Sequence, residues 1–297
     1  MTSKAASKIA KTATKKRKDT GSNYTVRCSL KELHNMLKTL NTDQKDELIK
    51  VGWGFLFDYN VNSNISRPMI IWLFNFIDKV TLTMDLGAGR KIEINPDVVH
   101  AVFNFPQGKL TPPRPSESGD TTALKWLKTG LGMSPTSKQD VTVLTLIRHI
   151  QKGGTDEFTM KCIFLIIFMK LVCPTQHARV STEAGMVHHF NYKNAINMDF
   201  CRVVVDELKR AVSKFQKSER NQNTAEGCAV LPLILYLDSV RCPASNLTNN
   251  TPRLQHLTTK TLNSIMRADT QDQKDSNGNP TFGKINGVSI YSIIIFK

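Results

Sequence analysis

Residues 84–105, MDLGAGRKIEINPDVVHAVFNF, carry the strongest local signal for the fold of this chain. Apolar and polar residues alternate on both sides of Gly87 and Gly89. This period of two predicts a β-hairpin over about 81–94, with the glycines supplying positive φ at the turn. The Asn-Pro pair at 95–96 then predicts the N-cap and first position of a helix. The stretch therefore indicates a small hairpin that leads directly into a helix.

The same glycines raise the alternative of a phosphate-binding loop. A dinucleotide fingerprint needs a strand, then G-x-G-x-x-G, then a helix, whereas here a strand follows the glycines and the third glycine is missing. The P-loop pattern G-x-x-x-x-G-K-[ST] is also absent from the sequence. We therefore interpret Gly87 and Gly89 as turn residues, and we expect no nucleotide cofactor here.

The overall composition is that of an ordinary globular protein with an unusual charge. The 297 residues are 40% hydrophobic and 22% charged, which suits one large domain or two small ones. The 40 Lys and Arg residues exceed the 25 Asp and Glu residues and give a formal net charge of +15. An excess of this size favours an anionic partner, either nucleic acid or an anionic membrane face.

Much of the positive charge lies in residues 1–22, which we predict to be a disordered basic tail. This segment has almost no large apolar side chain, so it cannot bury enough surface to fold by itself. Its KKRK cluster is typical of sequences bound by a nuclear import receptor or by a phosphate backbone. A solvated tail without a dedicated partner and an organelle transit peptide are the alternatives. The candidate contact residues are Lys11, Lys15, Lys16, Arg17 and Lys18.

The cysteines and the apolar runs exclude two further classes. The six cysteines form no C-x-x-C pair and no signal peptide precedes them, so we expect reduced thiols and no metal site. The most apolar run, 162–173, is twelve residues long and contains Lys170, well short of the ~20 residues that cross a bilayer. We predict a buried helix there and no membrane partner.

Helical periodicity dominates the rest of the chain and predicts a mainly α fold. Ser29, with Glu32 three residues later, forms a capping-box pattern before a helix at about 29–40. Thr42 is the predicted cap of the next helix, and Pro68 lies in the first turn of an apolar one.

The second half of the chain contains one clear amphipathic helix and several breaks. Residues 198–217 keep helical spacing of apolar residues, and we interpret their basic side as a solvated face because Asp206 and Glu207 interrupt it. The basic residues are Arg202, Lys209, Arg210, Lys214 and Lys217. The Pro-rich stretch 106–120 is predicted to leave the core as a loop. A buried helix at 227–240 is expected to kink at Pro232, the polar stretch 268–280 to be mobile, and 286–297 to be an atypical C-terminal segment.

The order of these segments resembles the plant mobile domain family, also labelled aminotransferase-like, of transposon-derived plant proteins. The resemblance spans about residues 45–285 and lies in the order of weak motifs. These motifs are Gly52-Trp53-Gly54-Phe55-Leu56, Ile-Trp-Leu at 71–73, the hairpin, Asn95-Pro96-Asp97-Val98-Val99 and Phe105-Pro106-Gln107-Gly108, followed by LVCPTQHARVS, Phe200 to Leu208 and LILYLDSV. The residues carrying it are Gly52, Trp53, Gly54, Trp72, Gly87, Gly89, Asp97, Val98, Pro106 and Gly108. Trp53 in place of Phe and Asn104 in place of Gly are departures that suggest a diverged copy.

The resemblance implies a helical domain at 23–285 and a nuclear, non-enzymatic function of transposon origin. The expected partners are nucleic acid or chromatin, a nuclear import receptor, and other proteins. One alternative is a pure protein-interaction platform whose basic tail serves only nuclear import. Another is a non-catalytic remnant of a transposon protein that is otherwise fused to a SUMO-protease-like cysteine peptidase.

Two enzymatic hypotheses are weighed against this interpretation. An aminotransferase would need a lysine that forms a Schiff base with pyridoxal phosphate, and no lysine here has such a context. A nucleophile and base pair would need His188 or His189 beside Cys173 or Cys201, which the sequence does not indicate. We therefore expect no enzyme activity and no cofactor.

Overall fold

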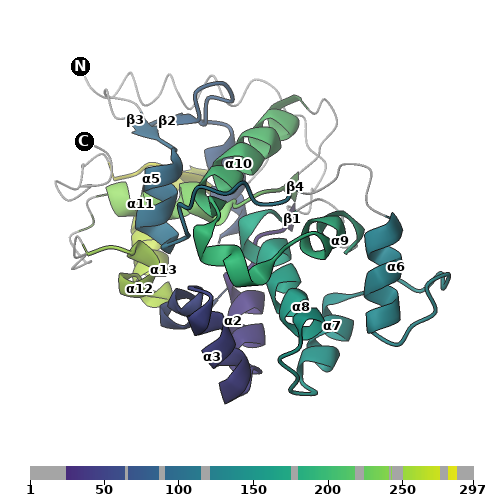
Figure 1. Ribbon diagram of the computed structural model, residues 1–297. Helices are drawn as coiled ribbons and strands as arrows, with labels where there is room; N and C mark the ends of the chain where they lie inside the picture. The colour runs from purple at the N-terminus through teal and green to yellow at the C-terminus, as the bar shows by residue number, and fades with distance from the viewer. Residues whose placement is uncertain are drawn as a thin grey trace.

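The computed structural model shows a mainly α domain, which confirms the predicted fold class (Figure 1). The residues that the structure describes are 25–63, 66–86, 91–114, 121–174, 180–217, 224–240, 242, 250–274 and 280–285. The predicted basic tail and the predicted C-terminal segment both lie outside these residues.

Helices make up most of the described chain. In order they are α2 (Leu30–Lys38), α3 (Thr42–Lys50), η2 (Gly54–Asp58), α4 (Arg67–Phe74), α5 (Pro96–Phe103), α6 (Thr121–Gly130), α7 (Val143–Ile150), α8 (Glu157–Ile167), the π-helical turn η3 (Phe168–Val172), α9 (Ser181–His188), η4 (Tyr192–Asn197), α10 (Phe200–Lys217), α11 (Val230–Ser239), α12 (Arg253–His256) and α13 (Thr259–Asp269).

The described strands are short and pair two by two. Two pairs are antiparallel hairpins, β2 (Thr83–Asp85) with β3 (Lys91–Glu93) and β5 (Thr270–Lys274) with β6 (Pro280–Phe282). The third pair is parallel and joins β1 (Thr25–Val26) to β4 (Thr224–Ala225). The β5–β6 hairpin corrects the prediction of a mobile stretch at 268–280 for residues 270–274, which form a strand, whereas 275–279 lie outside the described residues.

The predicted hairpin and the helix after it are confirmed. Met84 pairs with Ile92 in the hairpin register, and both side chains are buried. The Asn95 side chain accepts the Val98 N–H at 3.0 Å, as an N-cap does. Strand β2 begins two residues later than expected because Leu82 has a left-handed φ of 52°. Gly87 and Gly89 lie outside the described residues.

The first helix begins at Ser29 as predicted but without a complete capping box, and the second helix is capped one residue earlier than predicted. Ser29 does accept the Glu32 N–H at 3.2 Å, but the Glu32 carboxylate pairs with Lys170 at 2.6 Å instead of returning to the cap. The true capping box belongs to α3, where the N-cap is Asn41 rather than Thr42. Local pattern alone does not distinguish these two starts, because the competing partner of Glu32 lies far away in sequence.

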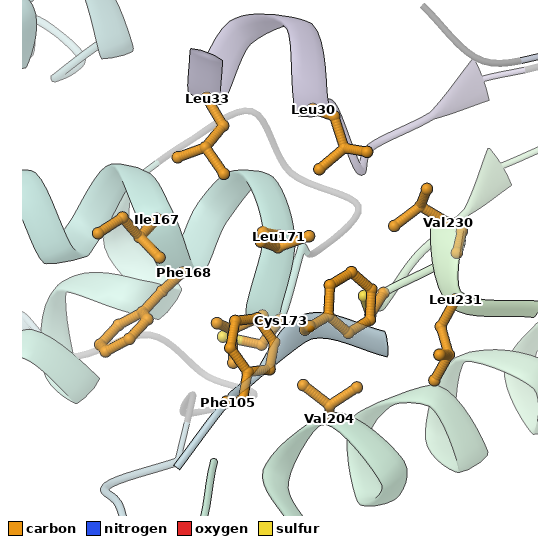
Figure 2. Packing of buried hydrophobic residues seen from close by; sticks show 14 of the residues in the cluster. Leu30, Leu33, Phe105, Ile167, Phe168, Leu171, Cys173, Val204, Val230 and Leu231 are labelled. Carbon is orange, nitrogen blue, oxygen red and sulfur yellow. The ribbon is translucent and has the colours of Figure 1, made fainter. Parts of the chain in front are cut away.

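The core is built around two helices that are buried almost all round, α8 and α11. Residues Thr159–Ile167 of α8 and Val230–Leu237 of α11 are all buried. Figure 2 shows side chains from α2, η3, α10 and α11 meeting between these helices. Pro232 lies in the first turn of α11, where a backbone N–H would have no acceptor within the helix. A proline fits there without the predicted kink.

The last described residues are fixed to this core by one buried carboxylate. Asp269, at the end of α13, accepts the Tyr236 hydroxyl at 2.6 Å and the N–H groups of Gly283 and Ile285 at 3.0 Å each. Phe282 in turn packs its ring on Trp72 of α4, with centroids 5.6 Å apart. The end of the described chain is therefore part of the core.

Candidate nucleic-acid interface

The residues predicted as functional fall into three groups in the structure. The five cations of the tail lie outside the described residues. The motif residues Gly52, Trp53, Pro106 and Gly108 come together around one segment, 196–200, and Gly54 lies against Ile49. We call this contact the Trp53 seam. The basic residues of 198–217 divide between two sides of α10.

Trp53 is the centre of the seam and is fully buried. Its ring meets Phe200 edge to face at 4.9 Å and Phe164 edge to face at 5.2 Å, and lies 5.7 Å from Phe105. The indole Nε1 has no hydrogen-bond partner among the described residues. A buried N–H surrounded by aromatic rings is a packing arrangement, so Trp53 supports the fold and offers no group to a ligand.

The glycines of the seam allow close approach. A Cβ on Gly108 would lie 1.9 Å from the carbonyl carbon of Asn197, and a Cβ on Gly52 would lie 2.4 Å from Cδ1 of Ile196. Gly52 also has a positive φ of 82°. Two motifs that are far apart in sequence therefore hold the same turn, η4, against the core.

Residues 106–110 run beside this turn instead of leaving the core. Gly108 N–H donates to Met198 O at 3.1 Å, and Phe200 N–H donates to Pro106 O at 3.0 Å. The prediction of a departing loop was therefore wrong for this first part of 106–120. Prolines indicated a loop, but the glycine among them allowed a backbone pairing that a sequence pattern does not show. Residues 115–120 lie outside the described residues.

The other motif residues also serve packing. Val98 is buried in α5, and Asp97 accepts the Gln107 side-chain amide at 2.9 Å, which ties α5 to the seam. Trp72 packs edge to face on Tyr236 at 5.3 Å. The motif residues that the structure describes thus contribute to the packing of the domain.

The inner side of α10 holds a balanced charge network. Glu207 accepts Arg210 Nε at 2.9 Å, and Glu226 accepts Lys214 Nζ at 2.7 Å. Arg210 Nη1 also lies 3.5 Å from Glu226. Glu207 and Glu226 are buried, and two cations face two carboxylates. This network neutralises itself and leaves no net charge for a partner.

The outer side of α10 carries a row of cations, Arg202, Lys209 and Lys217, all exposed. None of the three has a salt bridge to another described residue. Asp206 lies in the same row, and Arg114 pairs with it at 2.5 Å. We call Arg202, Asp206, Lys209, Ser213 and Lys217 the basic stripe.

The structure agrees with a solvated basic side on this helix and adds the partners of its two acids. The two acids that were expected to interrupt its basic side are both already paired, Glu207 on the inner side and Asp206 by Arg114. At 1.5 Å per residue, the three cations lie about 10 Å and 12 Å apart along the helix. The stripe is a candidate contact for a polyanion.

Both cysteines of the nucleophile hypothesis, Cys173 and Cys201, are buried. Burial, with smaller contributions from Asp199 and Asp97, raises the pKa of Cys201 well above its usual value, and its Sγ donates to Phe105 O at 3.3 Å. The Cys173 thiol donates to Met186 Sδ at 3.7 Å. The rings of His188 and His189 contact each other, with centroids 4.7 Å apart.

Two kinds of feature are absent from the described residues. They contain no group of three or more His, Cys, Asp or Glu side chains placed to hold a metal ion. Among the same residues, no helix combines the length and the apolar character that crossing a bilayer requires.

The fold and the stripe define a mainly α domain with one basic helix face. The profile of a family described as a domain of unknown function, DUF8566, matches residues 26–233. The chain belongs to this family, and the matched region contains both the Trp53 seam and α10. No curated protein and no solved structure matches the chain.

Proposed function

We propose that this chain is a non-enzymatic nuclear domain that binds nucleic acid or chromatin, and that it derives from a transposon protein of the plant mobile domain kind. The observation that carries the binding proposal is the basic stripe, because its cations have no acidic partner among the described residues. The net charge of +15 and the KKRK cluster support the same class of partner.

Binding to DNA is tested by anisotropy with a labelled duplex of mixed sequence at about 50 to 300 mM salt. The intact chain is compared with a chain lacking residues 1–22. We expect both to bind, with a smaller salt dependence for the shortened chain, because each phosphate contact contributes about −0.9 to the slope of log K against log salt. No binding by the intact chain at the lowest salt would contradict the proposal.

Nuclear localisation is tested separately with a fluorescent fusion in plant cells. Replacing Lys15, Lys16, Arg17 and Lys18 by alanine removes the cluster that an import receptor would grip. We expect the fusion to move from the nucleus to the cytoplasm. Nuclear accumulation of both forms, in a fusion too large to diffuse through pores, would show that the cluster does not direct import.

A second candidate function is a protein-interaction platform, and a specific surface favours it. Ile49, Leu110 and Ile196 are about half exposed, at 56%, 47% and 48%. All three border the Trp53 seam, since Ile49 contacts Gly54, Ile196 contacts Gly52 and Leu110 pairs with Asn197. Grouped exposed aliphatic side chains are typical of protein contacts.

This second function is tested by proximity labelling in cells with the intact chain and with an I49S/I196S variant. Loss of a defined set of labelled proteins in the variant would support a docking surface at the seam. The same labelled set with both chains would remove the observation that favours a platform.

A further inference from the structure

We propose that the basic stripe binds the phosphate backbone of double-stranded DNA along one strand, without reading the base sequence. This inference rests on the proposed nucleic-acid function and assigns it a contact surface on the folded domain. The basic tail then adds to DNA binding but is not the only part of the chain that contacts DNA.

The first step is the charge that the stripe presents. Its only acid, Asp206, is neutralised by Arg114 at 2.5 Å, so Arg202, Lys209 and Lys217 act with their full charge. The inner cations, Arg210 and Lys214, are paired with buried carboxylates. The stripe itself therefore offers three phosphate contacts along one side of the helix.

The second step is the length of that line. From Arg202 to Lys217 the helix rises about 22 Å. One strand of B-DNA carries a phosphate about every 3.4 Å along its axis, so the line spans about six phosphates. Three cations spread over this length match a backbone that passes along the helix, and they do not converge on a single anion.

The third step concerns what the stripe's side chains can recognise. Single strands are bound mainly by stacking of bases on aromatic rings, whereas the stripe consists of ions and a serine hydroxyl, groups that contact phosphates. Gln216, beside the stripe, is the kind of side chain that reads adenine. Its amide is already used, donating to Phe74 O at 2.9 Å and to Ile77 O at 2.7 Å.

The experiment compares the intact chain with R202A/K209A/K217A and with a matched control, K38A/K138A/K260A. The control removes the same net charge from three exposed lysines elsewhere. A labelled mixed-sequence duplex is titrated from about 50 to 200 mM salt. Loss of three phosphate contacts should reduce the slope of log K against log salt by about 2.7. Over this salt range, the affinity of the stripe variant should therefore fall by a factor about 40 times smaller than the affinity of the intact chain.

The outcomes separate this inference from the function on which it rests. A flattened slope in the stripe variant alone, with a charge-keeping R202K/K209R/K217R variant behaving like the intact chain, supports the stripe. Equal changes of the salt slope in the stripe variant and in the control would overturn the inference. They would mean that DNA contacts are spread over the surface of the domain. Tighter binding to a single strand of the same sequence would also overturn it. An intact chain that binds no DNA contradicts the proposed function itself.

Discussion

The Trp53 seam and the basic stripe lie close together in the chain, and they use their residues in opposite ways. Phe200, at the first position of α10, packs on Trp53 in the fully buried seam, whereas Arg202 two residues later points to solvent. The seam consists of aromatic rings and of glycines at which the neighbouring atoms leave no space for a side chain. The three cations of the stripe have no acidic partner among the described residues. Seam substitutions should therefore change stability, and stripe substitutions should change binding.

The largest effect is expected for Trp53→Ala. Removing a fully buried ring leaves a cavity among Phe105, Phe164 and Phe200, and should lower the free energy of unfolding by about 3 to 5 kcal/mol. Denaturant titration measures this loss. Trp126→Ala is the control, because Trp126 is only partly buried and should lose less. Equal losses would show that the seam is not the more tightly packed of the two sites.

The next effect is expected for Gly108→Ala. The new methyl group would meet the Asn197 backbone, which has no flexible end to move aside, and should destabilise the protein by about 3 kcal/mol. Gly132→Ala is the matched control, since its φ is +74° but nothing lies within 4 Å of the added carbon. It should lose only about 1 kcal/mol from backbone strain. Thermal melts of both variants give the comparison.

Substitutions of the charged residues on the inner side of α10 should change stability, as substitutions in the seam do. Glu226→Gln weakens the contacts with Lys214 and Arg210, and we expect a loss of about 2 kcal/mol because the carboxylate is buried. Glu32→Gln removes a carboxylate that is 55% exposed and should lose less than about 1 kcal/mol. Unfolding at low and high salt checks both, and similar losses would mean that burial does not distinguish these pairs.

Asp156 provides a test through pH. Burial acts to raise its pKa, but hydrogen bonds from the Thr159 side chain and from backbone N–H groups outweigh burial and hold the pKa below 3.8. Its ionised form therefore stabilises the start of α8 above the unfolded pKa of about 3.9, and this contribution is lost as pH falls through the lower folded value. Asp156→Asn keeps a side chain that caps the helix but removes this dependence of stability on pH.

Thermal melts between about pH 7 and pH 2.5 measure the difference. The gap in Tm between the intact chain and Asp156→Asn should be constant at neutral pH and should narrow in acid. A gap that stays constant to the lowest pH would mean that the carboxylate charge adds nothing to the cap.

The smallest effect on stability is expected for Lys209→Ala. An exposed cation without an acidic partner among the described residues should change the free energy of unfolding by less than about 0.5 kcal/mol. The same variant should lower DNA affinity, which anisotropy measures. A large loss of stability with unchanged affinity would reverse the contrast between seam and stripe.

Local signals in the sequence predicted the local structure well. The hairpin, the Asn95 cap and α10 followed from alternation, capping residues and helical spacing. The seam was not predictable, because it depends on Gly108 meeting a turn about ninety residues later. The pairing within the stripe was not predictable either, since the partner of Asp206 is Arg114, which is 92 residues away.

The pairing of β1 with β4 has a consequence for how the protein is made. Thr25 finds its partner Thr224 roughly two hundred residues later, so a growing chain cannot close this contact until most of its length has left the ribosome. Contacts of such long sequence separation fold slowly and leave apolar surface exposed meanwhile. The aliphatic face of α2, which follows β1 and packs on η3, would be uncovered until residues 168–172 have been made. Synthesis of this protein should therefore depend on chaperones that bind nascent chains.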